Sequence, residues 1–187
     1  KIIFMFNNII TFTMKYNLHI MKTSTFTQLA FCLLSSVFYA CNSSQIYYLD
    51  ATSGSDQNNG NSPQSAWQSM EPLKQISLQP GDKILFKKGE IFPGILELTG
   101  KGLSQSPIII DAYGEGNQKP CIAGNDTSMY AVRIFNSDYL TIQNLEISNT
   151  GEARKAGRTG LKVECTDYGI SHNIRINNLT IRDVNGS

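Results

Sequence analysis

Histidine and cysteine are scarce in this chain, which has two histidines and four cysteines among its 187 residues. So few of these side chains leave little from which to build a metal cluster. The sequence also lacks a nucleophile elbow, a phosphate-binding glycine loop and the Rossmann glycine pattern. These absences exclude the commonest motifs for metal, nucleotide and serine-nucleophile chemistry.

An excess of positive charge is lacking as well, because 16 basic residues are balanced by 15 acidic ones. The first forty residues contain Lys1, Lys15 and Lys22 and no carboxylate, so the remainder is mildly acidic. Proteins that bind nucleic acids need clustered positive charge to neutralise phosphates. We therefore expect no nucleic-acid partner.

Residues 1–20 lack alanine, glycine, proline, valine, arginine, aspartate and glutamate, and they do not begin with methionine. This composition fits neither a signal region nor a folded domain, so we interpret the segment as translated upstream sequence. The true start is then Met21 or Met14. The alternative is a membrane segment, although Asn7 and Asn8 interrupt its apolar character.

Residues 21–40 have the pattern of a signal peptide, with an early lysine, an apolar run too short to span a bilayer, and a small residue at the end. Cys41 follows this small residue directly, which resembles the lipobox of bacterial lipoproteins. The sequence predicts a lipid-anchored N-terminus at Cys41, a tether over 41–45 and a location in the cell envelope. Ordinary signal-peptidase cleavage and secretion are the alternative, because Phe38-Tyr39 is bulkier than a usual lipobox.

Cys121 and Cys165 are the cysteines left after the leader and the lipidated position. An exported protein can pair two such cysteines in a disulfide. A buried cysteine in a strand is also a common small apolar residue. We favour the second interpretation.

A short phrase occurs twice in the second half of the chain, as Ile142–Ile147 and again as Ile176–Ile181. Each matching position is offset by the same number of residues, which is typical of a repeat architecture. Apolar and polar residues alternate on both sides of Asn144 and Asn178, as in strands with one buried face. Asparagine tolerates the left-handed backbone of a tight corner. Each phrase therefore predicts two short strands joined at an asparagine.

Stacking these units in register places Asn144 above Asn178, so that their side-chain amides form a hydrogen-bonded ladder. The aliphatic residues of one phrase then lie over those of the other. This arrangement is an all-β coil of parallel strands around an apolar centre. Further strands are expected at Ile46–Asp50, Lys83–Phe86, Ile95–Leu98, Pro107–Asp111, Cys121–Ala123, Ala131–Phe135 and Leu161–Glu164.

One short amphipathic helix is expected before these strands, because Trp67, Met70, Leu73 and Ile76 recur at helical spacing. Ser69 is its predicted N-cap. A helix at this place would cover the apolar end of the first coil.

The stretch from Tyr47-Tyr48-Leu49-Asp50-Ala51 through Pro80-Gly81-Asp82-Lys83-Ile84-Leu85-Phe86 to Ala112-Tyr113-Gly114 resembles the opening of secreted bacterial right-handed parallel β-helix proteins. These proteins belong to the pectate-lyase-like superfamily. The resemblance implies that residues 46–187 are the N-terminal part of a right-handed parallel β-helix domain. We expect this domain to be truncated at its C-terminus.

The resemblance implies an exported, carbohydrate-active protein whose partner is a polysaccharide. The leading activity that it implies is that of a lyase acting on an acidic, uronate-containing glycan. A glycoside hydrolase on the same fold is one alternative, and a noncatalytic carbohydrate-binding or adhesive solenoid is the other. Lyases of this fold use calcium or a basic side chain against the uronate carboxylate, so calcium is a candidate cofactor of the full-length protein. Their catalytic positions lie in later coils, so we name no catalytic residue and expect the fragment to be inactive.

Candidate substrate-binding residues lie on two of the expected strands. Val132, Ile134, Leu161 and Val163 alternate inward, which leaves Arg133, Phe135, Lys162 and Glu164 pointing outward from neighbouring coils. Charged groups beside an aromatic ring are suited to grip a sugar. The alternative is an ordinary solvated strand face.

Other candidates lie in loops. Arg154 and Arg158 belong to a glycine-flanked basic loop over 151–160, and arginine suits carboxylate or sulfate groups. His172, beside Asp167 and Tyr168, is the only histidine after the leader. A carboxylate pair for glycoside hydrolysis would come from Glu164, Asp167 and Asp183. A basic surface loop and an exposed histidine without function are the alternatives.

Overall fold

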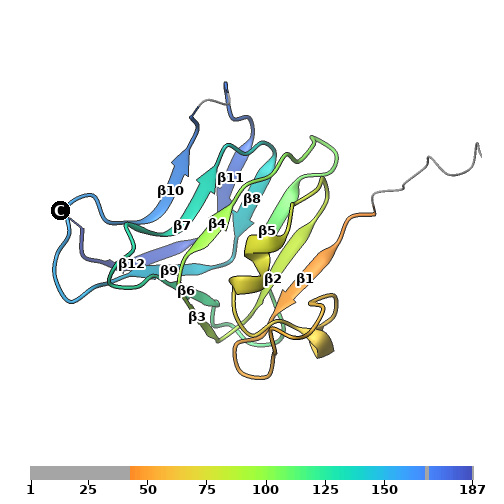
Figure 1. Cartoon of the computed structure of the whole chain (residues 1–187), viewed down its shortest axis with the longest axis horizontal. Helices are drawn as coiled ribbons and strands as arrows, with labels where there is room; N and C mark the ends of the chain where they lie inside the picture. The colour runs from red at the N-terminus through yellow and green to blue at the C-terminus, as the bar shows by residue number, and fades with distance from the viewer. Residues whose placement is uncertain (1–42, 167–168, 187) are drawn as a thin grey trace, which may run out of the picture. The chain divides into compact units, whose positions relative to one another are not determined.

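The computed structural model describes residues 43–166 and 169–186. The upstream segment 1–20, the signal peptide 21–40, the lipidation site Cys41 and the start of the tether lie outside the described residues. Every ladder between the described strands is parallel. Residues 50–82 connect β1 to β2, and shorter connections join the later strands. The protein is therefore an all-β parallel solenoid (Figure 1).

The largest sheet has five strands in the order β1-β2-β5-β8-β11. Because strands of one sheet are contributed by successive coils, they are distant in sequence and adjacent in space. The strands are β1 (Ile46–Leu49), β2 (Lys83–Lys87), β5 (Ile108–Tyr113), β8 (Leu140–Gln143) and β11 (Ile174–Asn177).

Two further sheets contain the remaining strands. One has the order β12-β9-β6-β3, from β3 (Ile91–Pro93), β6 (Cys121–Ala123), β9 (Glu146–Asn149) and β12 (Thr180–Val184). The other has the order β10-β7-β4, from β4 (Leu96–Leu98), β7 (Tyr130–Phe135) and β10 (Thr159–Glu164). A chain that visits the three sheets in turn is the coil that the repeated phrase predicts.

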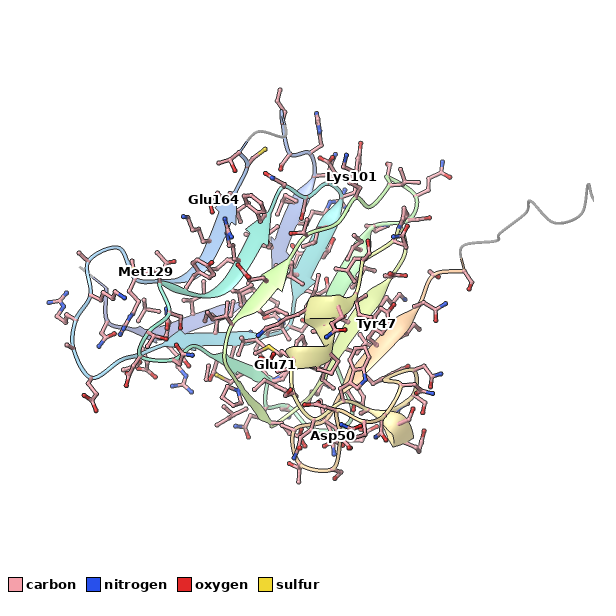
Figure 2. All side chains as sticks on the ribbon, in the orientation of Figure 1. Tyr47, Asp50, Glu71, Lys101, Met129 and Glu164 are labelled. Carbon is pink, nitrogen blue, oxygen red and sulfur yellow. The ribbon has the colours of Figure 1, made fainter. Side chains whose placement is uncertain are left out.

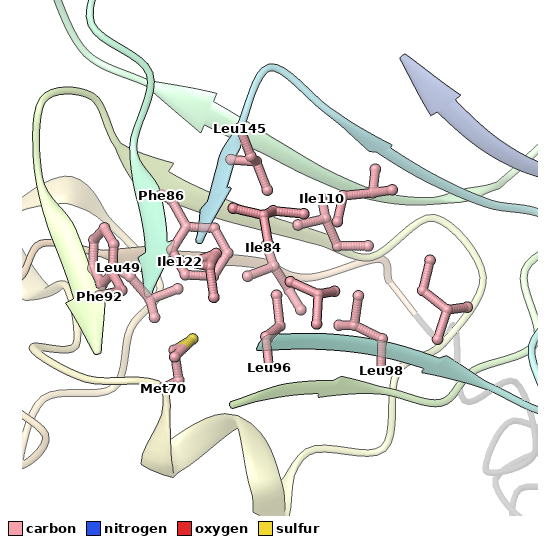
Figure 3. Close-up of a cluster of buried hydrophobic side chains, with 14 of the residues drawn as sticks. Leu49, Met70, Ile84, Phe86, Phe92, Leu96, Leu98, Ile110, Ile122 and Leu145 are labelled. Atoms are coloured by element: carbon pink, nitrogen blue, oxygen red, sulfur yellow. The ribbon is translucent and has the colours of Figure 1, made fainter. Parts of the chain in front are cut away.

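The core lies between the three sheets and consists of aliphatic and aromatic side chains stacked from coil to coil (Figure 3). Phe86 and Phe92 meet edge to face, with ring centroids 4.9 Å apart. Burying these side chains supplies the main favourable free energy of the fold. The largest fully buried residues are Phe86, Phe92, Leu49, Ile84, Leu96, Leu98, Ile108, Ile110, Ile122, Ile134, Leu140 and Ile142.

The repeated phrase folds as predicted. Ile176 pairs in register with Ile142, and Ile181 pairs with Ile147. Asn144 and Asn178 have φ values of 58° and 47°, so both adopt the left-handed conformation at the corner. The Asn178 side-chain amide donates to Asn144 Oδ1 at 2.7 Å, which confirms the ladder. The ladder continues to Asp111, whose Oδ1 accepts from Asn144 Nδ2 at 2.7 Å.

The predicted N-terminal α-helix is wrong, because no α-helix occurs in residues 43–166 and 169–186. Two short 3₁₀ helices are present instead, η1 (Pro63–Ser65) and η2 (Glu71–Gln75). The N-cap of η2 is Met70 rather than Ser69. The apolar residues of this segment recur at intervals of three, which is the period of a 3₁₀ helix and not of an α-helix.

The segment nevertheless covers the first coil. Trp67 forms a parallel bridge with Leu49 of β1, and its ring stacks on Tyr47 with centroids 5.4 Å apart. Met70 is buried as well. Trp67 in this bridge and Met70 at the N-cap of η2 thus take the place of the expected amphipathic helix. No helix in the described part of the chain has the length and apolar character required to cross a membrane.

Candidate functional site

The sheet formed by β4, β7 and β10 presents a polar outer face. Its inward side chains, Leu96, Leu98, Val132 and Ile134, are at most 1% exposed. Because successive side chains of a strand point to opposite faces, the residues between them point outward. We call the outward group the Arg133 ridge, and it comprises Glu97, Arg133, Phe135, Lys162 and Glu164. Tyr130 is included because its hydroxyl donates to Glu97 and its ring lies beside Arg133.

The register of the strands brings these side chains together from three coils. Arg133 of β7 lies opposite Glu97 of β4 on one side and Lys162 of β10 on the other. Glu164 lies opposite Phe135. The four residues predicted to share one surface, Arg133, Phe135, Lys162 and Glu164, are therefore neighbours. Figure 2 labels Glu164 among them.

Arg133 joins the two carboxylates of the ridge. Its Nε and Nη2 donate to Glu164 Oε2 at 3.0 and 2.9 Å, and its Nη1 donates to Glu97 Oε1 at 3.2 Å. Lys162 Nζ lies 3.1 Å from Glu164 Oε1. Both oxygens of Glu164 thus have a cationic partner, while Glu97 remains 55% exposed.

Two aromatic rings flank the arginine. The guanidinium carbon of Arg133 lies 4.1 Å from the centroid of Phe135 and 5.6 Å from that of Tyr130. The Tyr130 hydroxyl donates to Glu97 Oε1 at 3.0 Å. Cation–π contacts and these bonds hold Arg133 in one orientation, so the ridge is a preorganised surface.

The ion pairs shift the titration of the ridge. The bonds from Lys162 and Arg133 hold the pKa of Glu164 below its ordinary value, so this carboxylate stays ionised. Partial burial and the neighbouring Glu97 carboxylate raise the pKa of the Tyr130 hydroxyl, so it stays protonated and able to donate. At neutral pH the two carboxylates, the guanidinium and the ammonium give the ridge a net charge of zero.

The basic loop between β9 and β10 contains the candidate residues Arg154 and Arg158. The Arg158 side chain lies inside the fold, and the residue is 5% exposed. The guanidinium donates to the carbonyl of Asp126 and to Asn185 Oδ1. Arg154 is exposed, and its Nη2 donates to the Gly186 carbonyl at 2.9 Å. The two arginines are brought together in one loop but have different environments.

The remaining candidates do not converge on the ridge. The His172 side chain is 59% exposed and lies 3.3 Å from Asp138, while its expected neighbours Asp167 and Tyr168 are outside the described residues. Asp183 belongs to β12 and pairs with Arg182, in a different sheet from Glu164. Cys121 is buried and Cys165 is exposed, and both are free thiols. No cluster of three or more potential metal-ligating side chains occurs in the described ranges.

Glu97 and Tyr130 belong to the ridge but were not among the candidates from sequence. Glu97 alternates with Leu96 and Leu98, so the period of two places it outward. The neighbours of Glu97 on this face could not be predicted, because the sequence does not give the register between β4 and β7. Only the three-dimensional ladder shows that Glu97 faces Arg133.

Two solved structures of a GH136 lacto-N-biosidase from Eubacterium ramulus are similar to this chain. The selenomethionine derivative has 31% sequence identity and a TM-score of 0.66, and the native protein has 30% identity and a TM-score of 0.64. In each comparison the match covers 76% of this chain and 28% of the enzyme. The chain thus spans a little more than a quarter of the length of these enzymes.

A rhamnogalacturonan lyase also matches, with 12% identity and a TM-score of 0.45 over 72% of this chain and 36% of the lyase. A likeness at this level does not support one activity over another. No protein-family model and no curated protein sequence matches the chain. The likeness to the lacto-N-biosidase structures and the parallel coils together fit a parallel β-helix fold.

Proposed function

We propose that this chain belongs to an exported glycoside hydrolase of the parallel β-helix kind and contributes its glycan-binding first coils. The observation that carries the proposal is the 31% identity and TM-score of 0.66 with the lacto-N-biosidase over 76% of the chain. The parent scaffold is the right-handed β-helix of the pectate-lyase-like superfamily. Hydrolysis therefore takes precedence over the lyase activity that the sequence resemblance favoured.

The charge of the Arg133 ridge supports a neutral glycan over an acidic one. A polyuronate would need cations free to pair with its carboxylates. Arg133 is already bound to Glu97 and Glu164, and Lys162 is bound to Glu164. Displacing these partners would cost the interactions that they make. A neutral sugar needs no such exchange.

The ridge has the groups that a neutral sugar requires. Glu97 and Lys162 are 55% and 47% exposed, so they offer an acceptor and donors to hydroxyl groups. Tyr130 and Phe135 provide apolar ring surface for the carbon face of the sugar. Because Arg133 is fixed between them, little conformational entropy is lost on binding.

Binding to the ridge is tested by the double variant Glu97→Gln/Lys162→Met. Glu71→Gln/Lys74→Met is the matched control, because it removes an exposed ion pair of 2.6 Å outside the ridge. We expect the ridge variant to bind neutral oligosaccharides, among them chains ending in lacto-N-biose, about tenfold more weakly than the control in calorimetric titrations. Equal affinities would contradict the proposed surface.

The type of activity is tested on the full-length protein, because we expect the catalytic positions to lie in later coils. It is incubated with neutral oligosaccharides and with uronate polymers. New reducing ends without unsaturated uronate indicate a hydrolase. Absorbance of unsaturated uronate indicates a lyase and would overturn the proposal. Binding to glycans without either product would indicate a noncatalytic binding solenoid.

We also propose that the protein is exported and lipid-anchored through Cys41. The support is the signal-peptide pattern of residues 21–40 with a cysteine directly after it. Incorporation of labelled fatty acid that is lost in Cys41→Ser would support the anchor. Release of unlabelled protein after the ordinary cleavage would support secretion instead.

A further inference from the structure

An open pocket lies beside the start of β7 and β10, outside the Arg133 ridge. Its volume is about 290 Å³. The loop before β7 and the loop between β9 and β10 form its walls. The residues that line it are Asp126, Glu152, Ala153, Arg154, Lys155 and Arg158.

Arg158 is the buried base of this pocket. Its guanidinium donates to the carbonyls of Asp126 and Ala153 and to Asn185 Oδ1, so each of these acceptors is a neutral group. Gly151 packs flat against the guanidinium, and a side chain there would clash with both of its Nη atoms. Arg158 therefore holds three segments of the chain together, and its orientation is fixed.

Among the residues that the structure describes, none provides a counter-ion for Arg158. No ion pair among the described residues includes it, and its buried Nε has no hydrogen-bond partner. A buried cation without a paired anion is unfavourable, and the low dielectric around it strengthens its attraction for a negative ligand. This uncompensated charge is what distinguishes the pocket from a solvated basic loop.

The other charges of the pocket leave an excess of one positive charge. Arg154 and Lys155 are exposed cations whose bonds reach backbone carbonyls, of Gly186 at 2.9 Å and of Thr127 at 3.4 Å. Asp126 and Glu152 contribute two carboxylates, and Asp126 Oδ1 accepts from the Glu152 backbone N–H at 2.9 Å. Three cations and two carboxylates match a ligand with a single negative charge.

We propose that this pocket binds one oxyanion carried by a sugar, a carboxylate or a sulfate ester. The inference rests on the proposed function, because it makes the pocket a charged subsite next to the neutral Arg133 ridge. Both loops run directly into the strands that carry the ridge, and Met129 in Figure 2 marks the point where the first loop meets β7. The glycan that fits both surfaces is neutral over the ridge and bears one acidic group at the loop end.

The test titrates the isotopically labelled protein with three matched monosaccharides, glucuronate, glucose 6-sulfate and glucose, and follows backbone amide shifts by NMR. The two charged sugars separate a carboxylate from a sulfate. Arg154→Ala/Lys155→Ala removes the two exposed cations and leaves the buried Arg158 in place. Lys74→Ala/Lys88→Ala removes two cations outside the pocket and is the control.

We expect at least one charged sugar to shift the amides of 151–160, with an affinity about tenfold above that of glucose. Arg154→Ala/Lys155→Ala abolishes this difference and the control variant keeps it. Equal shifts with glucose, no shifts with either charged sugar, or equal loss in both variants overturns the inference. If neutral oligosaccharides still bind to the ridge in that case, the proposed function stands. Failure of the pocket inference can thus be distinguished from failure of the proposed function.

Discussion

Left-handed residues stand at both ends of two strands in the five-stranded sheet. Asn144 follows β8 and Asn178 follows β11, while Tyr139 precedes β8 and Asn173 precedes β11. A left-handed backbone costs most side chains about 1–2 kcal/mol, and asparagine is among the few that tolerate it. The corners of the coil are therefore encoded in single residues.

Asn144 has two roles at its corner, one in the backbone and one in the ladder. We expect Asn144→Ala to lower the free energy of unfolding by about 2 kcal/mol, because it adds backbone strain and removes the bonds to Asp111 and Asn178. Asn144→Gly keeps the backbone conformation and loses only the bonds. Urea unfolding should rank wild type above Asn144→Gly and this above Asn144→Ala. If the two variants lose the same free energy of unfolding, the lost hydrogen bonds of the ladder account for the whole loss and backbone strain for none of it.

Tyr139 is the one aromatic residue among the described left-handed positions, with φ of 47°. The corresponding residue one coil later is Asn173, since Leu140 and Ile174 are paired in register. We predict that Tyr139→Asn raises the free energy of unfolding by about 1 kcal/mol by relieving backbone strain. Thermal unfolding measures this gain. A lower melting temperature would show that contacts of the tyrosine ring outweigh the strain.

Stacked columns of aliphatic side chains stabilise the sheets. The column of the five-stranded sheet has one buried and one exposed isoleucine in register, and these two residues can be compared. Ile142 is fully buried, while its partner Ile176 in the next coil is 48% exposed. We expect Ile142→Ala to cost about 3 kcal/mol by leaving a cavity, and Ile176→Ala to cost clearly less. Denaturant titration of both variants tests this order. Equal losses would contradict the stacking account.

The strands could be predicted from sequence where a repeat or an alternation marks them. The phrase duplicated at Ile142 and Ile176 located β8, β9, β11 and β12, and alternation located β7 and β10. β3 is not predicted by the sequence, because a run as short as Ile91–Pro93 that contains a proline is more typical of a turn than of a strand. Apolar residues three apart also lie on one face of an α-helix, so the sequence predicts a longer helix than the 3₁₀ turn η2 that the structure has. Register between distant strands is a property of the folded coil, and so Glu97 could not be assigned to the ridge.

The whole protein should be most stable between mildly acidic and mildly alkaline pH. The bond from Arg182 lowers the pKa of Glu146, and the bonds from Lys162 and Arg133 lower that of Glu164. Burial raises the pKa of Tyr113 to about 12. The two carboxylates thus stabilise the fold above about pH 4, the pKa of a carboxylate in the unfolded chain. This stabilisation is lost as the pH falls below about 4. The neutral tyrosine stabilises the fold below about pH 10, and this is lost as pH rises toward 12.

We predict a melting temperature that is level near neutral pH, falls below about pH 4 and falls again above about pH 10. Circular dichroism melts across this range test the prediction. Glu164→Gln should make the fall in melting temperature at acidic pH smaller, because it removes one of the carboxylates whose pKa is lowered. A melting temperature that rises on acidification would contradict the role given to these ion pairs.

The arrangement of the three sheets links the stability of the core to the proposed binding surface. The solenoid core positions β4, β7 and β10, and their register assembles the Arg133 ridge from coils that are distant in sequence. The loop pocket at the start of β7 and β10 adds a charged end to this neutral surface. A sugar chain is an extended ligand, and a surface built from successive strands matches this extension.

The most direct measurement maps a neutral oligosaccharide onto the protein by amide chemical shifts. Binding at the ridge predicts shifts confined to β4, β7 and β10, with the largest near Glu97, Arg133 and Lys162, and their loss in Glu97→Gln/Lys162→Met. Shifts on the five-stranded sheet instead, or no shifts with any neutral glycan, would contradict the account.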